Sequence, residues 1–103
     1  MALPDLTPEQ RAEALEKATR ARRRRAEVKT SLKSREMTLS EALALAETDE
    51  AIAKMKVVTL LESLPRVGAN TAAQLMQDVR IAPSRRVRGL GPVQREELVK
   101  RFG

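Results

Sequence analysis

The sequence predicts an all-α fold, in which one long N-terminal helix precedes a small helical domain that contains a tight corner. Three observations support this prediction. Capping signals recur before long helix-compatible runs, apolar residues return at a helical spacing, and proline and glycine gather at a few breaks. The 103 residues are expected to form a single domain over 1–103, with an aliphatic core because Phe102 is the only aromatic residue.

The first predicted helix covers residues 8–34. Thr7 is a natural N-cap, Pro8 suits the first helical position, and Gln10 completes a capping box. No glycine or proline follows until well past Lys33. At about 100° per residue, a weakly apolar stripe runs along this helix. It consists of Ala14, Ala18, Ala21, Val28 and Leu32.

A basic stripe lies beside the apolar one. It consists of Arg22, Arg25, Lys29 and Lys33. Arg23 and Arg24 point away from it, so the run RRRR at 22–25 does not form one patch. Contact with an anion and an ordinary solvated helical face explain this stripe equally well, and both interpretations stay open.

The segment between residues 38 and 64 predicts three short helices. Thr38 and Glu41 form a second capping box and start a helix near 39–46. Thr48 and Asp49 provide a new N-cap for a helix near 49–53, and a third helix runs to Leu64. The expected core residues here are Leu39, Leu43, Ile52, Met55, Val58, Leu60, Leu61 and Leu64.

The stretch LPRVGANTAAQL, residues 64–75, predicts a helix-hairpin-helix corner. Pro65 ends one helix, Gly68 lets the chain turn, and Ala72 lets the next helix approach closely. Backbone N–H groups at the start of the second helix are expected to point outward and to bind phosphate oxygen. The candidate contacts are Arg66, Val67, Gly68, Ala69 and Asn70. A purely architectural corner would use the same residues, so that interpretation also stays open.

The C-terminal part combines an arginine-rich turn with a last helix. Arg85, Arg86 and Arg88 lie in SRRVRGLG, and guanidinium groups suit bidentate phosphate contacts and narrow minor grooves. The final segment, PVQREELVKRFG, predicts a helix with Val93, Leu98 and Phe102 facing inward. Other cations are expected to be simply solvated: Lys54, Lys56, Arg95, Lys100 and Arg101.

Charge and composition narrow the function. The first 50 residues hold ten basic and ten acidic residues, whereas residues 51–103 hold ten and four, which points to a polyanionic partner. The absence of His and Cys removes the usual parts of nucleophilic and zinc sites, so we expect no enzyme, cofactor or metal. The lack of a long apolar run predicts a cytoplasmic protein without membrane contact. The scarcity of aromatic residues favours duplex DNA over single strands.

The blocks KMKVVTLLESLPRVGANTAAQLM and IAPSRRVRGLG, together with the basic first helix, resemble the actinobacterial integration host factor family over nearly the whole chain. The family is similar to ribosomal protein S13 in a helix-two-turns-helix region. The resemblance implies a nucleoid-associated protein that binds double-stranded DNA with little sequence specificity and bends or constrains it. It also implies assistance to phage integrase, and we expect a monomer in solution. The family's hairpin falls on Pro65, Val67 and Gly68, and its arginine cluster falls on residues 85–88.

Three alternatives stay open at this point. An RNA-binding or ribosome-associated protein would also use an S13-like corner. Base-excision enzymes use this kind of hairpin too, but the chain is short, and Glu62 and Asp78 are carboxylates without a visible partner. A module that binds only other proteins is the third alternative.

Overall fold

The computed structural model describes residues 6–103, and the all-α prediction is confirmed. The helices are α1 (Pro8–Lys33), α2 (Leu39–Leu45), α3 (Glu50–Ala53), α4 (Val57–Glu62), α5 (Ala69–Asp78), the 3₁₀ helix η1 (Val87–Gly89) and α6 (Pro92–Phe102). Within these described residues no strand forms, and extended pairing is limited to one isolated antiparallel bridge between Lys56 and Arg86. Residues 1–5 of the expected domain lie outside the description.

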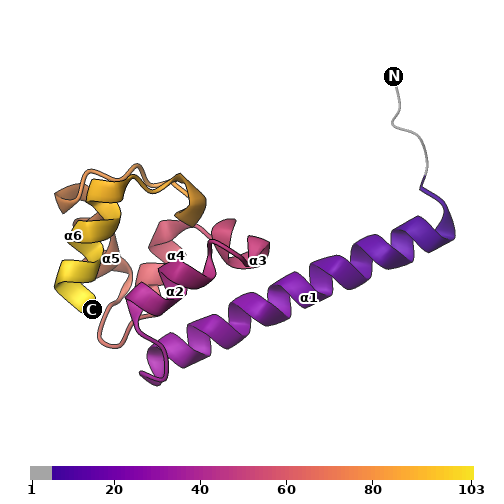
Figure 1. Ribbon diagram of the computed structural model, residues 1–103, viewed down its shortest axis with the longest axis horizontal. Helices are drawn as coiled ribbons and strands as arrows, with labels where there is room; N and C mark the ends of the chain where they lie inside the picture. Colours follow the sequence, from indigo (N-terminus) through magenta and orange to yellow (C-terminus); the bar gives the residue numbers. More distant parts are fainter. Residues whose placement is uncertain (1–5) are drawn as a thin grey trace.

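Helix α1 is anchored to the domain only by its C-terminal half. The expected capping box at Thr7 and Gln10 is present. Figure 1 shows α1 projecting away from the other helices, and every residue from 8 to 20 is exposed. Only Val28 and Leu32 of the expected apolar stripe are buried, whereas Ala14 and Ala18 are exposed. Alanine has little surface to bury, so the N-terminal part of the stripe would gain little free energy from packing.

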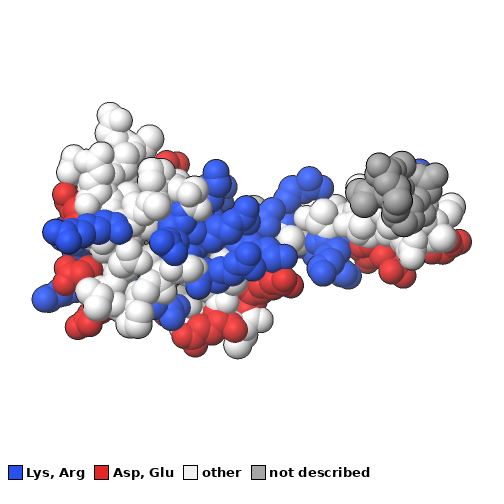
Figure 2. Space-filling model, turned by 90° about the horizontal axis from the view of Figure 1, so that it is seen from above, with Lys and Arg blue, Asp and Glu red and all other residues white. Residues whose placement is uncertain are grey.

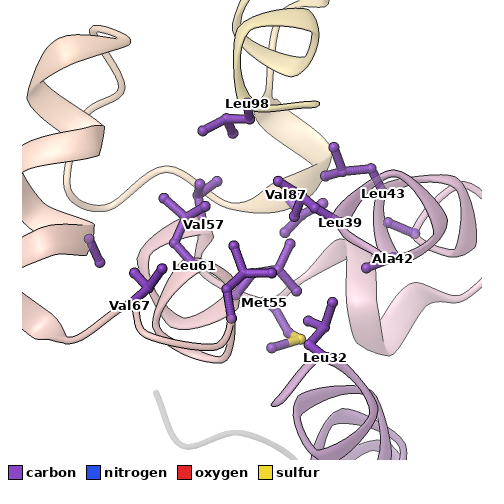
Figure 3. Close-up of a cluster of buried hydrophobic side chains, with 14 of the residues drawn as sticks. Leu32, Leu39, Ala42, Leu43, Met55, Val57, Leu61, Val67, Val87 and Leu98 are labelled. Carbon is purple, nitrogen blue, oxygen red and sulfur yellow. The ribbon is translucent and has the colours of Figure 1, made fainter. Parts of the chain in front are cut away.

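The remaining helices enclose one aliphatic core. Figure 3 shows side chains from α1, α2, α4 and α6 converging with Val67 and Val87. Seven of the eight expected residues between 38 and 64 are buried. They are Leu39, Leu43, Ile52, Met55, Leu60, Leu61 and Leu64. The eighth, Val58, is half-buried and packs against the core, and its neighbour Val57, which was not predicted, is buried. Within residues 6–103, no helix has the length and apolarity needed to cross a membrane.

Helix α6 corrects one core prediction. Leu98 is buried and Phe102 packs against the core, as expected, but the side chain of Val93 is 71% exposed. Val93 and Leu98 are five positions apart, which places the two side chains about 140° apart on a helix. Since Leu98 faces the core, Val93 faces solvent.

Candidate nucleic-acid interface

The corner between α4 and α5 is built from consecutive tight turns. Helix α4 ends at Glu62, two residues earlier than predicted. The N–H of Leu64 then donates to the carbonyl of Leu61 (3.0 Å), and the N–H of Val67 donates to that of Leu64 (3.2 Å). Gly68 follows as the N-cap of α5. These turns reverse the chain within a few residues, as a helix-two-turns-helix arrangement requires.

The residue that carries the strained backbone of this corner is Arg66, not Gly68. Gly68 has φ −92° and ψ −178°, an extended conformation that other residues adopt readily, so the expected role of Gly68 in turning the chain was wrong. Arg66 has φ 64°, where a non-glycine residue costs about 1 kcal/mol or more. A Cβ at Gly68 would meet no atom of the described chain within 4 Å. Gly68 therefore leaves the backbone open to close approach.

The first turn of α5 presents unsatisfied backbone donors. No side chain of the described residues caps this helix, and the N–H groups of Gly68, Ala69 and Asn70 have no acceptor among them. These three residues are exposed. Val67 differs from the prediction, because its N–H is used in the turn and its side chain is buried in the core. The outward-facing donors therefore begin at Gly68 rather than at Val67.

The end of α1 brings cations to the corner. Nζ of Lys33 donates to the carbonyls of Leu64 (3.3 Å) and Glu62 (3.5 Å), so Lys33 also caps the C-terminus of α4. Arg35 lines a cavity of about 290 Å³ with Leu64, among others. Arg35 was not predicted as a site residue. In the sequence, only its position two residues after Lys33 could have indicated Arg35. Its nearness to the corner depends on the fold.

A second group of cations surrounds a hollow of about 350 Å³, which we call the basic junction. Its basic residues are Arg25 and Lys29 of α1, Lys54 and Lys56 before α4, and Arg86 before η1. Met55 and Thr59 complete the lining of the hollow, and no acidic residue of the described chain contributes to it. Figure 2 shows basic side chains gathered in a band that crosses from the helical domain onto the long helix.

Backbone pairing between two distant segments assembles the basic junction. The N–H of Val57 donates to the carbonyl of Arg85 (2.9 Å), and the N–H of Val87 donates to that of Met55 (2.8 Å). Arg86 lies between these two bonds, and its Nη1 donates to the carbonyl of Lys54 (3.0 Å). This pairing brings residues 54–56 beside residue 86. Lys54 and Lys56 were expected to be ordinary solvated residues, and the structure places both in the lining of the junction.

The three predicted arginines near η1 have different surroundings. Arg86 alone among them lines the basic junction. The Nη1 of Arg85 donates to the carbonyl of Gly89 (3.2 Å), so this side chain folds over the 3₁₀ turn. Arg88 lines a separate hollow that also contains Glu47 and Arg95. Arg22, which was expected to act with Arg25, is exposed on α1 but does not line the junction.

Comparisons with known proteins agree with this geometry. Residues 32–102 match the family model of the S13-like H2TH domain. The integration host factor of Mycobacterium tuberculosis (strain ATCC 25618 / H37Rv) is 55% identical over 103 residues, which cover 100% of this chain and 98% of the relative. That of Mycolicibacterium smegmatis (strain ATCC 700084 / mc(2)155) is 56% identical over 102 residues, covering 99% and 97%.

A solved structure shares the fold as well as the sequence. It is described as "Structure of sIHF bound to an 8bp palindromic DNA" and is 50% identical to this chain, with a TM-score of 0.83. The match covers 85% of this chain and 99% of the solved one. These matches confirm the resemblance found in the sequence: the chain belongs to the integration host factor family and carries an S13-like H2TH domain.

Proposed function

We propose that this protein is a nucleoid-associated architectural protein that binds double-stranded DNA with low sequence specificity and bends or constrains it. The observation that carries the proposal is the basic junction, where five basic residues from three chain segments line one hollow. Lys54 is also paired with Glu50 (2.9 Å), which lies outside that lining. A closely similar protein of the same family has been solved bound to DNA. Concentrated positive charge of this kind suits the phosphate backbone.

The proposed contacts use charge and backbone donors rather than base-specific groups. Lysine, arginine and main-chain N–H groups fix a protein on the duplex but read no sequence through phosphates, which accounts for low specificity. Arginines near η1 also suit a narrow minor groove. The DNA contacts proposed from the sequence are Arg22, Arg25, Lys29, Lys33, Arg66, Val67, Gly68, Ala69, Asn70, Arg85, Arg86 and Arg88, and the junction adds Lys54 and Lys56. Among these, Val67 is expected to contribute through its place in the turn, because its side chain is buried.

The proposed bending would let one duplex contact both regions. Lys33 at the C-terminal end of α1 contacts the corner, and Arg25 and Lys29 of the basic junction lie farther back along the same helix. The energy needed to bend DNA is offset by the additional phosphate contacts. We infer that helix 8–34 and the core of residues 38–103 act together as one binding unit. We further propose a monomer that works in the nucleoid, without enzymatic activity, and that supports phage integrase in a nucleoprotein complex.

Binding to structured RNA is the alternative that the test below also addresses, because residues 32–102 match an S13-like domain and S13 is a ribosomal protein. The relatives named integration host factor and the solved neighbour bound to DNA favour DNA instead. Duplex RNA offers the same phosphate charge as DNA but a deep, narrow major groove and a shallow minor groove.

Binding measured over a range of salt concentrations tests the proposal. Two unrelated DNA duplexes and one RNA duplex of equal length would be titrated with the protein. We expect similar affinities for both DNAs, weaker binding to RNA, and a log–log salt slope of about −0.9 for each phosphate neutralised. Preference for the RNA would favour the RNA alternative. A strong preference for one DNA sequence would contradict low specificity.

A further inference from the structure

Few contacts hold the long helix against the domain. Its residues 8–20 are exposed, and its buried side chains are Val28 and Leu32, near the C-terminal end. One polar contact lies farther toward the N-terminus: Nε of Arg24 donates to Oδ2 of Asp49 at 2.7 Å. Ala21 and Arg25 are half-buried on either side of Arg24, where α1 packs against α3. Since this is the contact between α1 and the domain that lies nearest the projecting part, we expect the ion pair to influence the direction of the helix.

Both oxygens of the Asp49 carboxylate accept a hydrogen bond from the protein. Its Oδ1 accepts the N–H of Ala51 (3.0 Å) and thereby caps α3, while Oδ2 accepts the guanidinium of Arg24. The side chain of Asp49 is 22% exposed, against 56% for Glu27, the other partner of Arg24. The hydrogen bond that Arg24 donates to Asp49 is the main cause that raises the pKa of Arg24. The ion pair of Arg24 with Asp49 is therefore less exposed to solvent than its ion pair with Glu27.

Arg24 and Asp49 each lie close in sequence to basic residues of the junction, Arg24 on α1 and Asp49 on the segment that leads to Lys54 and Lys56. Arg24 precedes Arg25, which lines the junction from α1. Asp49 is the N-cap of the four-residue helix α3, and Lys54 directly follows that helix as its C-cap. A hollow between α1 and α3 is lined by Arg24, Asp49, Arg25 and Lys54 together. Moving α1 relative to α3 would therefore separate Arg25 and Lys29 from Lys54 and Lys56.

We propose that Arg24 and Asp49 are positioning residues for DNA binding. Their ion pair sets the direction of α1, so that Arg25 and Lys29 meet the same duplex as Lys54, Lys56 and Arg86. Arg24 acts through Asp49 and not through a phosphate. This inference rests on the proposed binding of duplex DNA by the basic junction.

Two explanations of Asp49 predict opposite effects of neutralising it on DNA affinity. An aspartate close to a DNA-binding surface repels phosphates, so neutralising it should leave DNA affinity unchanged or raise it. If Asp49 positions α1, neutralising it should lower the affinity. The direction of the change therefore separates a positioning role from a background charge.

The test uses Asp49→Asn in the full chain. Asparagine is as good an N-cap as aspartate, so α3 is expected to remain folded, but the new amide places a donor against the donor of Arg24. We expect DNA affinity to fall at least threefold. We also expect a salt slope less steep by about 0.9 to 1.8, which corresponds to one or two lost phosphate contacts. Circular dichroism checks the fold, and Asp49→Ser is the second variant, because serine also caps helices.

Two control variants complete the design. Glu27→Gln removes the same negative charge and the other partner of Arg24, an exposed i,i+3 pair, so we expect affinity and slope at or slightly above the wild-type values. Arg24→Lys preserves the ion pair and should stay within twofold of wild type. Unchanged or tighter binding by Asp49→Asn, with wild-type DNA binding intact, would overturn the inference. Failure of the wild type itself to bind DNA would instead overturn the proposed function.

Discussion

The corner and the basic junction present DNA with two different kinds of surface. The corner offers neutral N–H groups at the start of α5, with Arg66 and Lys33 close by. The basic junction offers the side chains of five lysine and arginine residues. The donors of the corner are fixed by the backbone, whereas those of the junction are fixed by long-range contacts between segments.

This difference separates orientation from affinity. Rigid main-chain donors lose little entropy when they bind, and they hold one phosphate at a defined place. Charged side chains release counterions, which gives most of the binding energy and its dependence on salt. We therefore expect the corner to orient the protein on DNA and the basic junction to supply most of the affinity.

The largest effect is expected from the triple variant Arg25→Ala/Lys29→Ala/Lys56→Ala. Loss of three phosphate contacts should weaken binding about a hundredfold near physiological salt. The matched control, Arg23→Ala/Lys100→Ala/Arg101→Ala, removes three exposed charges outside the junction. Electrophoretic mobility shift measurements would compare both. Equal losses in the two variants would mean that net charge, and not the junction, determines affinity.

A smaller effect is expected from Gly68→Ala. The new methyl group meets no atom of the described chain, so the free energy of unfolding should change by less than about 1 kcal/mol. It would, however, occupy space beside the N–H groups of the corner. We expect about a tenfold loss of DNA affinity, similar to one lost charge-assisted hydrogen bond. Titration calorimetry measures the DNA affinity, and thermal unfolding measures the stability. If Gly68→Ala binds DNA with wild-type affinity, the corner does not contact DNA.

The smallest effect on binding is expected from Arg66→Gly, which should also stabilise the fold. Glycine relieves the left-handed strain, so the free energy of unfolding should rise by about 0.5 to 1 kcal/mol. Loss of one cation should weaken DNA binding about fivefold. Arg80, with φ 61°, allows the matched control Arg80→Gly, which should give the same gain in stability. A loss of stability in Arg66→Gly would show that the side chain of Arg66 packs against the fold.

Local rules predicted the helices well. Both capping boxes, at Thr7 and Thr38, depend on residues three positions apart, and the structure has both. The predicted N-cap at Asp49 is also confirmed. Errors appeared where the facing of a side chain or a backbone angle mattered: Val93 faces solvent, and the left-handed residue of the corner is Arg66 rather than Gly68. Such features depend on how the elements pack together, which spacing along the chain does not determine.

The candidate site was only partly predictable for the same reason. The corner is continuous in sequence, so its residues could be named directly. The basic junction depends on a bridge between Lys56 and Arg86, thirty positions apart, and on the docking of α1 through Arg24 and Asp49. Nothing in the spacing of Lys54 and Lys56 indicates either contact. The structure thus gives these two lysines greater weight than the sequence did, and gives Arg85 and Arg88 less.

The central claim is tested most directly by the salt slopes of Gly68→Ala and of the triple junction variant on one duplex. The two regions differ in charge, so their variants should differ in slope. We expect the triple variant to lower the steepness of the log–log slope by about 2.7, and Gly68→Ala to weaken binding at every salt concentration with the wild-type slope. Equal changes of slope in the two variants would contradict the division between an orienting corner and a charge-supplying junction.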